Sequence, residues 1–186
     1  MKRVFDILLA FFFGLNLLVP IIIVAILVKL TSKGPILYWS DRVGKNNTIF
    51  KMPKFRSMNV DTPIVATHLL ADPKNVLTPV GNFLRKSSLD ELPQLWSIIK
   101  GDMSFVGPRP ALFNQYDLIE LRTDKKIDRL VPGITGWAQV NGRDELSIPD
   151  KVKYDEEYFK RRTFLFDLRI LWLTLIRVFF ARGVSH

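Results

Sequence analysis

The longest uncharged apolar stretch of the chain lies close to its N-terminus and covers residues 7–28. As one straight helix this stretch would extend about 33 Å, which is enough to cross the hydrocarbon core of a bilayer. The stretch is too long for the apolar part of a signal peptide, and no small-residue cleavage site follows it. It therefore predicts a retained anchor embedded in the membrane.

Pro20 lies near the middle of this stretch, where it removes the backbone hydrogen bond to the carbonyl of Asn16 and bends a helix. Asn16 is the only strongly polar residue of the stretch, and its amide is placed to help satisfy the disrupted turn. One interpretation is a kinked spanning helix, because membrane helices tolerate proline. The other is a re-entrant hairpin, because basic residues flank both ends and favour a cytoplasmic position for both. These flanking residues are Lys2, Arg3, Lys29 and Lys33.

Patterns after the anchor predict a small amount of β-structure. Residues 36–40 and 48–51 are rich in β-branched and aromatic side chains, and residues 44–47 between them have the composition of a turn. We therefore expect a hairpin within residues 35–58. The proline-containing segment 59–80 has no clear periodicity and predicts a surface loop.

Helical patterns dominate the remainder of the chain. They predict helices over residues 80–86, 93–100, 114–130, 151–162 and 164–180. In the last of these, Asp167, Thr174 and Arg177 fall on one arc, so the helix fits either the membrane interface or the protein core. We expect a mostly helical α+β fold in two parts, an anchor of residues 1–33 and a compact domain of residues 34–186.

The charge of the chain indicates an anionic partner. The chain carries 27 Lys and Arg against 18 Asp and Glu, a formal net charge of +9. This excess suits nucleic acid, an anionic membrane surface or a phosphorylated small molecule. The absence of cysteine excludes disulfides, thiolate nucleophiles and Cys-ligated zinc. His68 and His186 are far apart in the sequence, which disfavours a histidine metal cluster.

Two adjacent carboxylates stand at a predicted helix start in segment 88–95, SLDELPQL. Ser88 and Glu91 match a capping box. Asp90 is an alternative N-cap, because it would place Pro93 at the third position of the helix, where no backbone N–H is needed. A carboxylate at a helix N-terminus would stay ionised and would lie near bound phosphate. An ionised Asp can attack a phosphoryl group, and a neighbouring Glu can help to hold Mg²⁺. Helix cap and nucleophile are therefore compatible interpretations, and we expect chemistry built on a capping position.

Basic residues are concentrated between the anchor and this pair. Those of segment 29–56 fit attraction to anionic lipid headgroups, although Lys54 and Arg56 stand close enough to hold one phosphate together. Arg85 precedes the acidic pair and is expected to neutralise phosphoryl oxygens.

Two further segments combine polar side chains with restricted or flexible backbone. Arg109 stands between Pro108 and Pro110, which predicts either a solvated loop residue or a preorganised guanidinium that binds phosphate at little entropic cost. Segment 132–143 mixes three glycines with planar polar groups, and it fits either a flexible turn or a loop that closes over a nucleotide.

Taken together, these motifs resemble those of the monotopic phosphoglycosyl transferases, the bacterial sugar transferases that begin lipid-linked glycan assembly. The motifs that carry the resemblance are KFRSM at 54–58, SLDELPQLW at 88–96, KGDMSFVGPRP at 100–110 and PGITGWAQVNGR at 132–143. They follow a proline-broken N-terminal helix in the expected order and cover nearly the whole chain, as in the small members that consist of the catalytic domain alone.

The resemblance implies transfer of a sugar-1-phosphate from a UDP-sugar to a polyprenyl phosphate such as undecaprenyl phosphate, with release of UMP. The reaction would be ping-pong through a phosphosugar–aspartyl intermediate, as the first membrane step of O-antigen, capsule, exopolysaccharide or glycoprotein assembly. The resemblance also implies Mg²⁺ as cofactor, interfacial amphipathic helices among membrane phospholipids, and a catalytic domain on the cytoplasmic face of the bacterial inner membrane. It allows a homodimer.

By similarity, Asp90 would be the nucleophile and Glu91 would assist with Mg²⁺ and proton handling, both residues being candidate metal ligands. The candidate substrate-binding residues, from the pattern or from the resemblance, are Lys54, Arg56, Arg85, Arg109, Pro110, Gln139, Asn141, Arg143, Asp155 and Asp167. Family members bend a re-entrant helix at a Ser-Pro pair, whereas Val19 precedes Pro20 here. We therefore hypothesise that Asn16 substitutes for the missing hydroxyl.

Two other functions fit parts of the pattern. A membrane-tethered nucleic-acid-binding protein would use the positive charge, but aromatic side chains are not interleaved with the basic ones, and we expect no nucleic acid partner. A phosphatase with an aspartyl intermediate usually carries a second Asp two residues after the nucleophile, where this chain has Leu92. Weak DNA binding without UMP release would favour the first function, and release of free phosphate the second.

Overall fold

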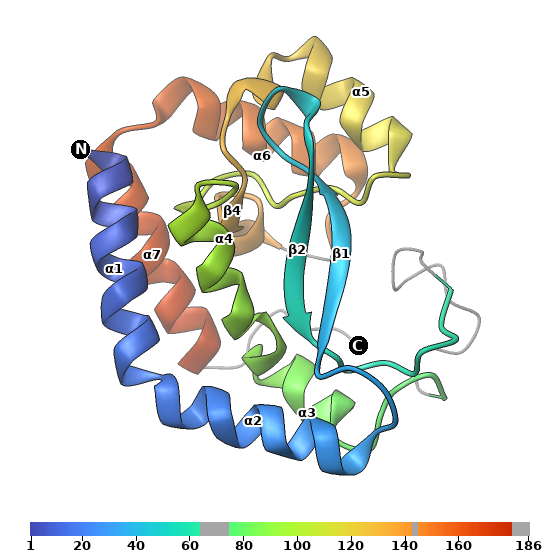
Figure 1. The fold of residues 1–186 in the computed structure, drawn as a ribbon. Coiled ribbons are helices and arrows are strands. Elements are labelled where there is room, and N and C mark those ends of the chain that lie inside the picture. Colours follow the sequence, from blue (N-terminus) through green and yellow to red (C-terminus); the bar gives the residue numbers. More distant parts are fainter. Residues whose placement is uncertain (64–74, 143–144, 180–186) are drawn as a thin grey trace.

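The N-terminal apolar stretch forms two helices in the computed structural model, which describes residues 1–63, 75–142 and 145–179. Helix α1 spans Lys2–Asn16 and helix α2 spans Leu18–Thr31, and the pair is bent by 64° (Figure 1). No single described helix is long and apolar enough to cross a membrane, but this bent pair passes that test together, by length and composition. The predicted bend in the stretch is confirmed.

The break lies at Leu17, three residues before the proline that was expected to cause it. Pro20 is the third residue of α2, a position at which a helix needs no backbone N–H. The missing N–H would otherwise bind the carbonyl of Asn16, which is the last residue of α1. The Asn16 side chain instead donates to the carbonyl of Phe12 at 2.8 Å, one turn before the break. The expectation that this amide satisfies the turn disrupted by Pro20 is therefore wrong.

Three polar side chains at the start of α1 tie this helix to the rest of the chain. Lys2 contacts a carboxylate of the C-terminal helix at 2.7 Å. Arg3 donates to carbonyls at the end of helix α4, Leu95–Lys100. The buried carboxylate of Asp6 accepts a hydrogen bond from the backbone amide of Phe105 at 3.2 Å. These contacts orient α1 before its apolar part begins.

Helix α1 also contributes to the main hydrophobic core. Ala10 is buried there with Ile98, Met103 and Ile170, and Phe13 packs against the cluster. The helix predicted as part of the anchor therefore shares a core with the domain that was predicted to begin at residue 34.

The predicted hairpin is present and is longer than expected. Strands β1, Leu37–Val43, and β2, Ile49–Phe55, pair antiparallel and are joined by a 3₁₀ turn at Lys45–Asn47. The register places Tyr38 opposite Lys54. Because side chains alternate along a strand, every second residue from Tyr38 along β1 lies on the same face as Lys54.

A second sheet of two short strands brings distant segments together. Strand β3, Ser104–Val106, pairs parallel with β4, Gly133–Thr135. A Cβ added to Gly133 would lie 2.1 Å from the backbone nitrogen of Gly107, so this close approach requires glycine. The pairing holds the segment that follows β3, which contains Arg109, in a defined place.

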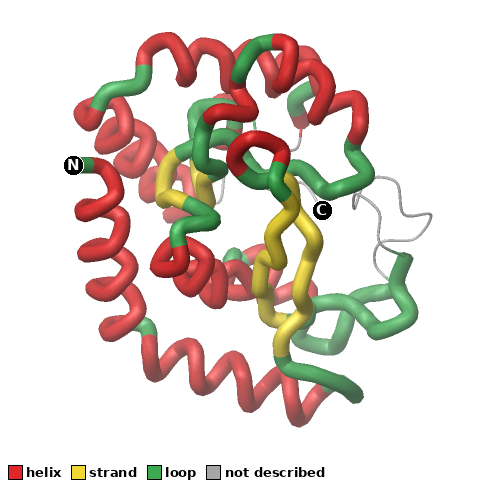
Figure 2. The backbone as a smooth tube through the Cα atoms, turned by 45° about the horizontal axis from the view of Figure 1, so that its top comes forward, coloured by secondary structure: helices red, strands yellow, loops and turns green. Residues whose placement is uncertain are grey.

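The other helices agree with prediction in position and differ in length. They are α3, Gly81–Lys86; α5, Tyr116–Asp124; α6, Ile148–Arg161; and α7, Phe164–Phe179. The helix predicted over 114–130 ends at residue 124 and gives way to a 3₁₀ turn, Ile127–Arg129. The helices lie around the periphery, with the strands between them (Figure 2).

Helix α7 presents two different faces. Phe166 and Ile170 are buried in the main core cluster, whereas Leu165 and Trp172 are exposed. The core interpretation therefore holds for one face of the helix, and an apolar second face remains uncovered by the described chain.

Candidate active site

The acidic pair lies on a short 3₁₀ turn rather than at the start of an α-helix. The turn covers Leu89–Gln94 and is followed directly by α4, so Pro93 lies inside it. Ser88 precedes the turn in a left-handed conformation, with φ of 57°. In that conformation its side-chain oxygen is not directed at the amides that an extended N-cap residue reaches. Ser88 is the residue that precedes the turn, as one alternative predicted, but neither Ser88 nor Asp90 forms a side-chain cap.

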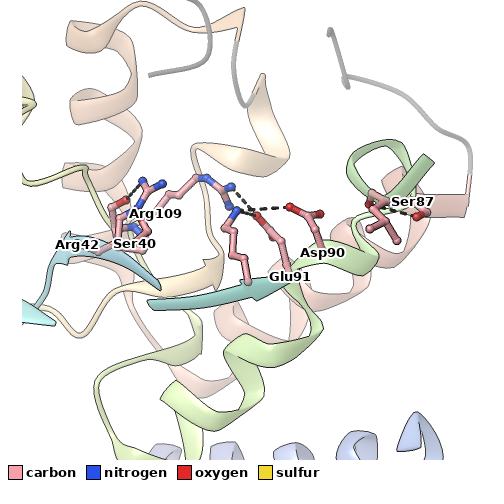
Figure 3. Close-up of polar contacts among 9 residues, drawn as sticks. Ser40, Arg42, Ser87, Asp90, Glu91 and Arg109 are labelled. Atoms are coloured by element: carbon pink, nitrogen blue, oxygen red, sulfur yellow. Dashed lines mark hydrogen bonds and ion pairs between the residues drawn. The ribbon is translucent and has the colours of Figure 1, made fainter. Parts of the chain in front are cut away.

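The two carboxylates have unequal contacts (Figure 3). Oε1 of Glu91 lies 2.8 Å from Nζ of Lys54 and 2.7 Å from Nη2 of Arg109. Oδ2 of Asp90 lies 3.8 Å from the same Lys54 nitrogen and accepts no hydrogen bond from a described residue. Glu91 is therefore held by two cations, whereas Asp90 is left with oxygens available for a ligand.

The environment also separates the two carboxylates electrostatically. Burial raises the pKa of Asp90, and the charge of Glu91 adds to this effect, while Lys54, Arg85 and Arg109 oppose it. Burial alone would also raise the pKa of Glu91, but the charges and hydrogen bonds of Arg109 and Lys54 hold it well below its usual range. Asp90 was expected to lie at the start of an α-helix, whose dipole would favour its ionised form. It lies instead on a short 3₁₀ turn, and burial is the largest influence on its pKa.

Arg42 joins the site from β1, on the same face of the hairpin as Lys54. Its Nε donates to Oγ of Ser40 at 3.0 Å, and its Nη1 donates to the carbonyl of Pro110 at 3.2 Å. Sequence reasoning counted Arg42 only among the basic residues attracted to headgroups. The strand alternation that places it on the same face as Lys54 was the signal that could have found it.

Asp155 was predicted to bind substrate, but it forms a structural ion pair. It is 1% exposed and accepts hydrogen bonds from Nε and Nη2 of Arg122, at 3.0 and 2.6 Å. Arg122 Nη1 also donates to the carbonyl of Arg109 at 2.8 Å. Asp155 therefore contributes to the site indirectly, because it holds Arg122, which in turn binds the backbone of Arg109.

Asp167 is likewise buried in the protein and not directed to the acidic pair. It contacts Lys2 at 2.7 Å and accepts a hydrogen bond from the hydroxyl of Tyr158 at 2.7 Å. Burial, with the Asp167 charge in addition, raises the pKa of Tyr158. In the described structure the oxygens of Asp167, on α7, bind Lys2 of α1 and Tyr158 of α6, and its substrate role stays a prediction.

Lys54 and Arg56 do not meet at one phosphate position, as had been considered. Strand β2 ends at Phe55, so the alternation that would place both side chains on one face no longer applies to Arg56. Arg56 is buried and donates to the carbonyl and hydroxyl of Ser32, while its Nε and Nη1 have no hydrogen-bond partner in the part of the chain that the structure describes. It holds the end of α2 rather than the acidic pair.

The segment predicted to close over a nucleotide forms the 3₁₀ turn Gln139–Asn141. Both side-chain amide atoms of Gln139 are buried without a partner among residues 1–63, 75–142 and 145–179, and Asn141 donates to the carbonyl of Trp137 at 2.7 Å. Among the described residues, neither side chain forms a hydrogen bond with Asp90 or Glu91. Arg143 lies outside the described residues.

A divalent metal would have few protein ligands here. Among the described residues there is no group of three or more His, Asp or Glu side chains that could hold a metal ion. Both cations that bind Glu91 contact Oε1, which leaves Oε2 and the Asp90 carboxylate as ligand oxygens. This set suits Mg²⁺, which commonly takes one or two carboxylates and completes its shell with substrate phosphates and water.

The chain is similar to known proteins along nearly its whole length. A family model described as bacterial sugar transferase matches residues 1–181. The uncharacterized sugar transferase EpsL of Bacillus subtilis is 39% identical over 188 residues, which cover 100% of this chain and 91% of the relative. The exopolysaccharide production protein ExoY of Sinorhizobium fredii is 37% identical and covers 98% of this chain and 87% of its own length.

A longer relative is the UDP-glucose:undecaprenyl-phosphate glucose-1-phosphate transferase of Escherichia coli. It is 42% identical over 193 residues, which cover 96% of this chain but 40% of the relative, so this chain spans less than half of that protein. The family match over nearly the whole chain, together with relatives aligned from end to end, shows that the chain belongs to the bacterial sugar transferase family.

Proposed function

We propose that this chain transfers a sugar-1-phosphate from a UDP-sugar to a polyprenyl phosphate, with release of UMP, through a covalent intermediate on Asp90. The names of the relatives support this class of donor and acceptor, since the Escherichia coli protein is named as a UDP-glucose:undecaprenyl-phosphate transferase and a Salmonella relative as an undecaprenyl-phosphate galactose phosphotransferase.

The observation that carries the proposal is the unequal treatment of the two carboxylates. Glu91 is bound through Oε1 by both Lys54 and Arg109, whereas Asp90 has no hydrogen bond among the described residues and lies within 3.8 Å of one cation. An attacking carboxylate must have an unoccupied oxygen whose charge is not already taken up by cations, and its neighbours must accept the negative charge of a phosphoryl group. Asp90 meets these conditions better than Glu91, whose charge is held by two cations.

The reaction then has two steps at one phosphorus atom. A carboxylate oxygen of Asp90 attacks the β-phosphorus of the UDP-sugar, the bond from that phosphorus to the bridging oxygen breaks, and UMP leaves with the bridging oxygen. The sugar phosphate is now bound to Asp90 as an acyl phosphate. An oxygen of the polyprenyl phosphate attacks the same phosphorus, and the carboxylate of Asp90 is released.

The surrounding residues orient and neutralise the reacting groups. Lys54, Arg85 and Arg109 favour the ionised form of Asp90 that burial disfavours, and their charges match the anionic diphosphate. Glu91 holds Lys54 and Arg109 in place through one oxygen. Mg²⁺, when bound by the free carboxylate oxygens and the diphosphate, would reduce the negative charge that the attacking carboxylate meets.

The bent helix pair supports a position at the membrane. Large apolar side chains on α1 and α2 are exposed, among them Phe11, Phe12, Leu15, Ile22, Ile23 and Ile26. In our proposal α1 and α2 enter and leave the bilayer on the cytoplasmic side. Single cysteines at Met1 and Lys33 test this, since labelling from opposite sides of sealed vesicles would rule out the re-entrant anchor.

The reaction is tested by measuring UMP release from a panel of UDP-sugars with polyprenyl phosphate and Mg²⁺. We expect one or a few donors to release UMP and to transfer radiolabelled sugar into the lipid extract. Asp90→Asn should abolish both signals. Asp124→Asn, which removes a carboxylate from the exposed side of α5, is the matched control and should keep full activity.

A second measurement addresses the covalent intermediate. With UDP-sugar and no acceptor, the enzyme should release one equivalent of UMP and gain the mass of a sugar phosphate on the peptide that contains Asp90. Full turnover by Asp90→Asn, or turnover without any mass gain under these conditions, would refute the two-step route.

A further inference from the structure

Arg42 is a part-buried cation that has no carboxylate within ion-pair distance among the described residues. Its two hydrogen bonds go to neutral acceptors, the hydroxyl of Ser40 and the carbonyl of Pro110. Its Nη2 donates to no described residue. Withdrawing a charged group from water without a counter-ion is unfavourable, so a native protein usually pairs it.

A second arginine in the same region shows the usual solution. Arg122 donates to the carbonyl of Arg109, the residue before the carbonyl that Arg42 binds, and its charge is compensated by Asp155 at 2.6 Å. Two guanidinium groups therefore hold consecutive carbonyls of one segment. Only Arg122 has an acidic partner, so bracing of this segment does not by itself explain why Arg42 is left uncompensated.

The uncompensated charge lies on the side of the acidic pair. Burial and then the charge of Arg109 lower the pKa of Arg42 to about 10, while Glu91 acts in the opposite direction, which places all three groups within electrostatic reach. Figure 3 shows Arg42 beside Arg109, which extends towards Glu91. At neutral pH both arginines remain charged, and they repel one another.

Two mutually repelling cations are stable together once an anion lies between or beside them. Guanidinium groups suit phosphate because their planar N–H donors match its oxygens. Arg109 has one nitrogen on Glu91, and Arg42 has Nη2 without a protein partner. The missing counter-charge thus has the chemistry of a phosphate group.

We propose that Arg42 is a ligand-binding residue, which donates to an anionic oxygen of a diphosphate-bearing substrate beside Arg109. The assignment rests on the proposed function for the identity of that substrate, but the chemistry it requires is only that of a diphosphate. Bound ligand supplies the counter-ion that the protein does not provide, while Ser40 and the Pro110 carbonyl orient the guanidinium.

The test compares anion binding and stability in the purified full chain, using inorganic pyrophosphate and UDP as probes. Arg42→Met should weaken binding of both probes about 10- to 100-fold, the loss expected for one hydrogen bond to a charged group. Without a probe, the same variant should unfold at or above the wild-type temperature, because an uncompensated charge has been removed. Arg42→Lys keeps the positive charge but not the planar arrangement of N–H donors. Its affinity for the probes should lie between those of wild type and Arg42→Met.

Arg129→Met provides the charge-matched control, since it removes an exposed arginine from the 3₁₀ turn after α5 and should change neither measurement. The inference is overturned if Arg42→Met binds both probes as tightly as wild type, or if the wild-type chain binds neither. It is also overturned if the variant loses stability while its affinity stays unchanged, since Arg42 would then be only a brace.

The outcome is separate from that of the proposed reaction. Probe binding that depends on Arg42, in a chain that releases no UMP from any UDP-sugar, would keep this site and reject the transferase reaction. UMP release by a chain whose probe binding does not depend on Arg42 would support the transferase reaction and reject the Arg42 site.

Discussion

Replacing Arg122 by methionine tests the buried ion pair behind the acidic site. Arg122 provides the hydrogen bonds that Asp155 receives in its 1% exposed position, and it also holds the carbonyl of Arg109. Methionine fills a similar volume without charge. The change therefore leaves a buried carboxylate unpaired and frees the backbone of a site residue.

Breaking a buried pair by removing one partner costs about 3–5 kcal/mol. For a chain of this size, each kcal/mol shifts the unfolding midpoint by about 2–4 °C, so we expect a decrease of about 6–20 °C. A double variant, Arg122→Met with Asp155→Asn, removes the buried charge as well and should recover part of this loss.

The loss should also depend on pH. Burial raises the pKa of Asp155, and Arg122 opposes that effect, so the Arg122→Met substitution moves this pKa further upward. A folded carboxyl with a raised pKa holds a proton that the unfolded chain releases. Stability therefore falls as the pH rises from about 4, the unfolded value, through the folded pKa.

Thermal unfolding of detergent-solubilised wild type, the single variant and the double variant, each at about pH 5 and about pH 8, measures these effects. The single variant should lose more at the higher pH, and the double variant should show little difference between the two. Our reasoning is wrong if the single variant lies within about 1 kcal/mol of wild type at both values, or if its loss is independent of pH.

Two more predictions follow from the site and from the backbone. Lys54→Met removes a cation that lowers the pKa of Asp90, so the acidic limb of the pH–rate profile should move to higher pH; an unshifted limb would show that Asp90 ionisation does not control the rate. Gly81→Ala should destabilise the chain because its Cβ would lie 2.0 Å from the carbonyl oxygen of Ser57. Gly14→Ala in α1 meets nothing within 4 Å and should stabilise the chain by up to about 1 kcal/mol. Equal unfolding midpoints for these two variants would contradict the packing at Gly81.

The sequence pattern alone predicted the elements that neighbouring residues determine. The hairpin follows from a run of β-favouring residues around a turn, and the helix break follows from one missing N–H at Pro20. The acidic pair was recognised from its motif, and the structure places Lys54 and Arg109 around it as expected.

Prediction from the sequence failed for side chains whose partners or burial depend on contacts between distant segments. Asp155 stands in a charged segment and Asp167 in an apolar one, but their partners lie 33 and 165 positions away, at Arg122 and Lys2, and no local spacing indicates such pairs. The pKa of Asp90 was expected to follow a helix end, whereas it follows the burial that the surrounding elements impose. Burial of a polar side chain depends on the assembled fold, and its residue type does not reveal it.

The polar start of α1 has a consequence for how the proposed enzyme works at a bilayer. Because Lys2, Arg3 and Asp6 bind α7, α4 and the backbone of β3, helix α1 is fixed to the catalytic body and is not a flexible tether. If α1 and α2 enter a bilayer as we propose, the protein itself would set the height of the Asp90 carboxylate above the lipid surface. An acceptor would then react only when its phosphate lies at that height, and depth in the interface would select acceptors beside the chemistry of their headgroup.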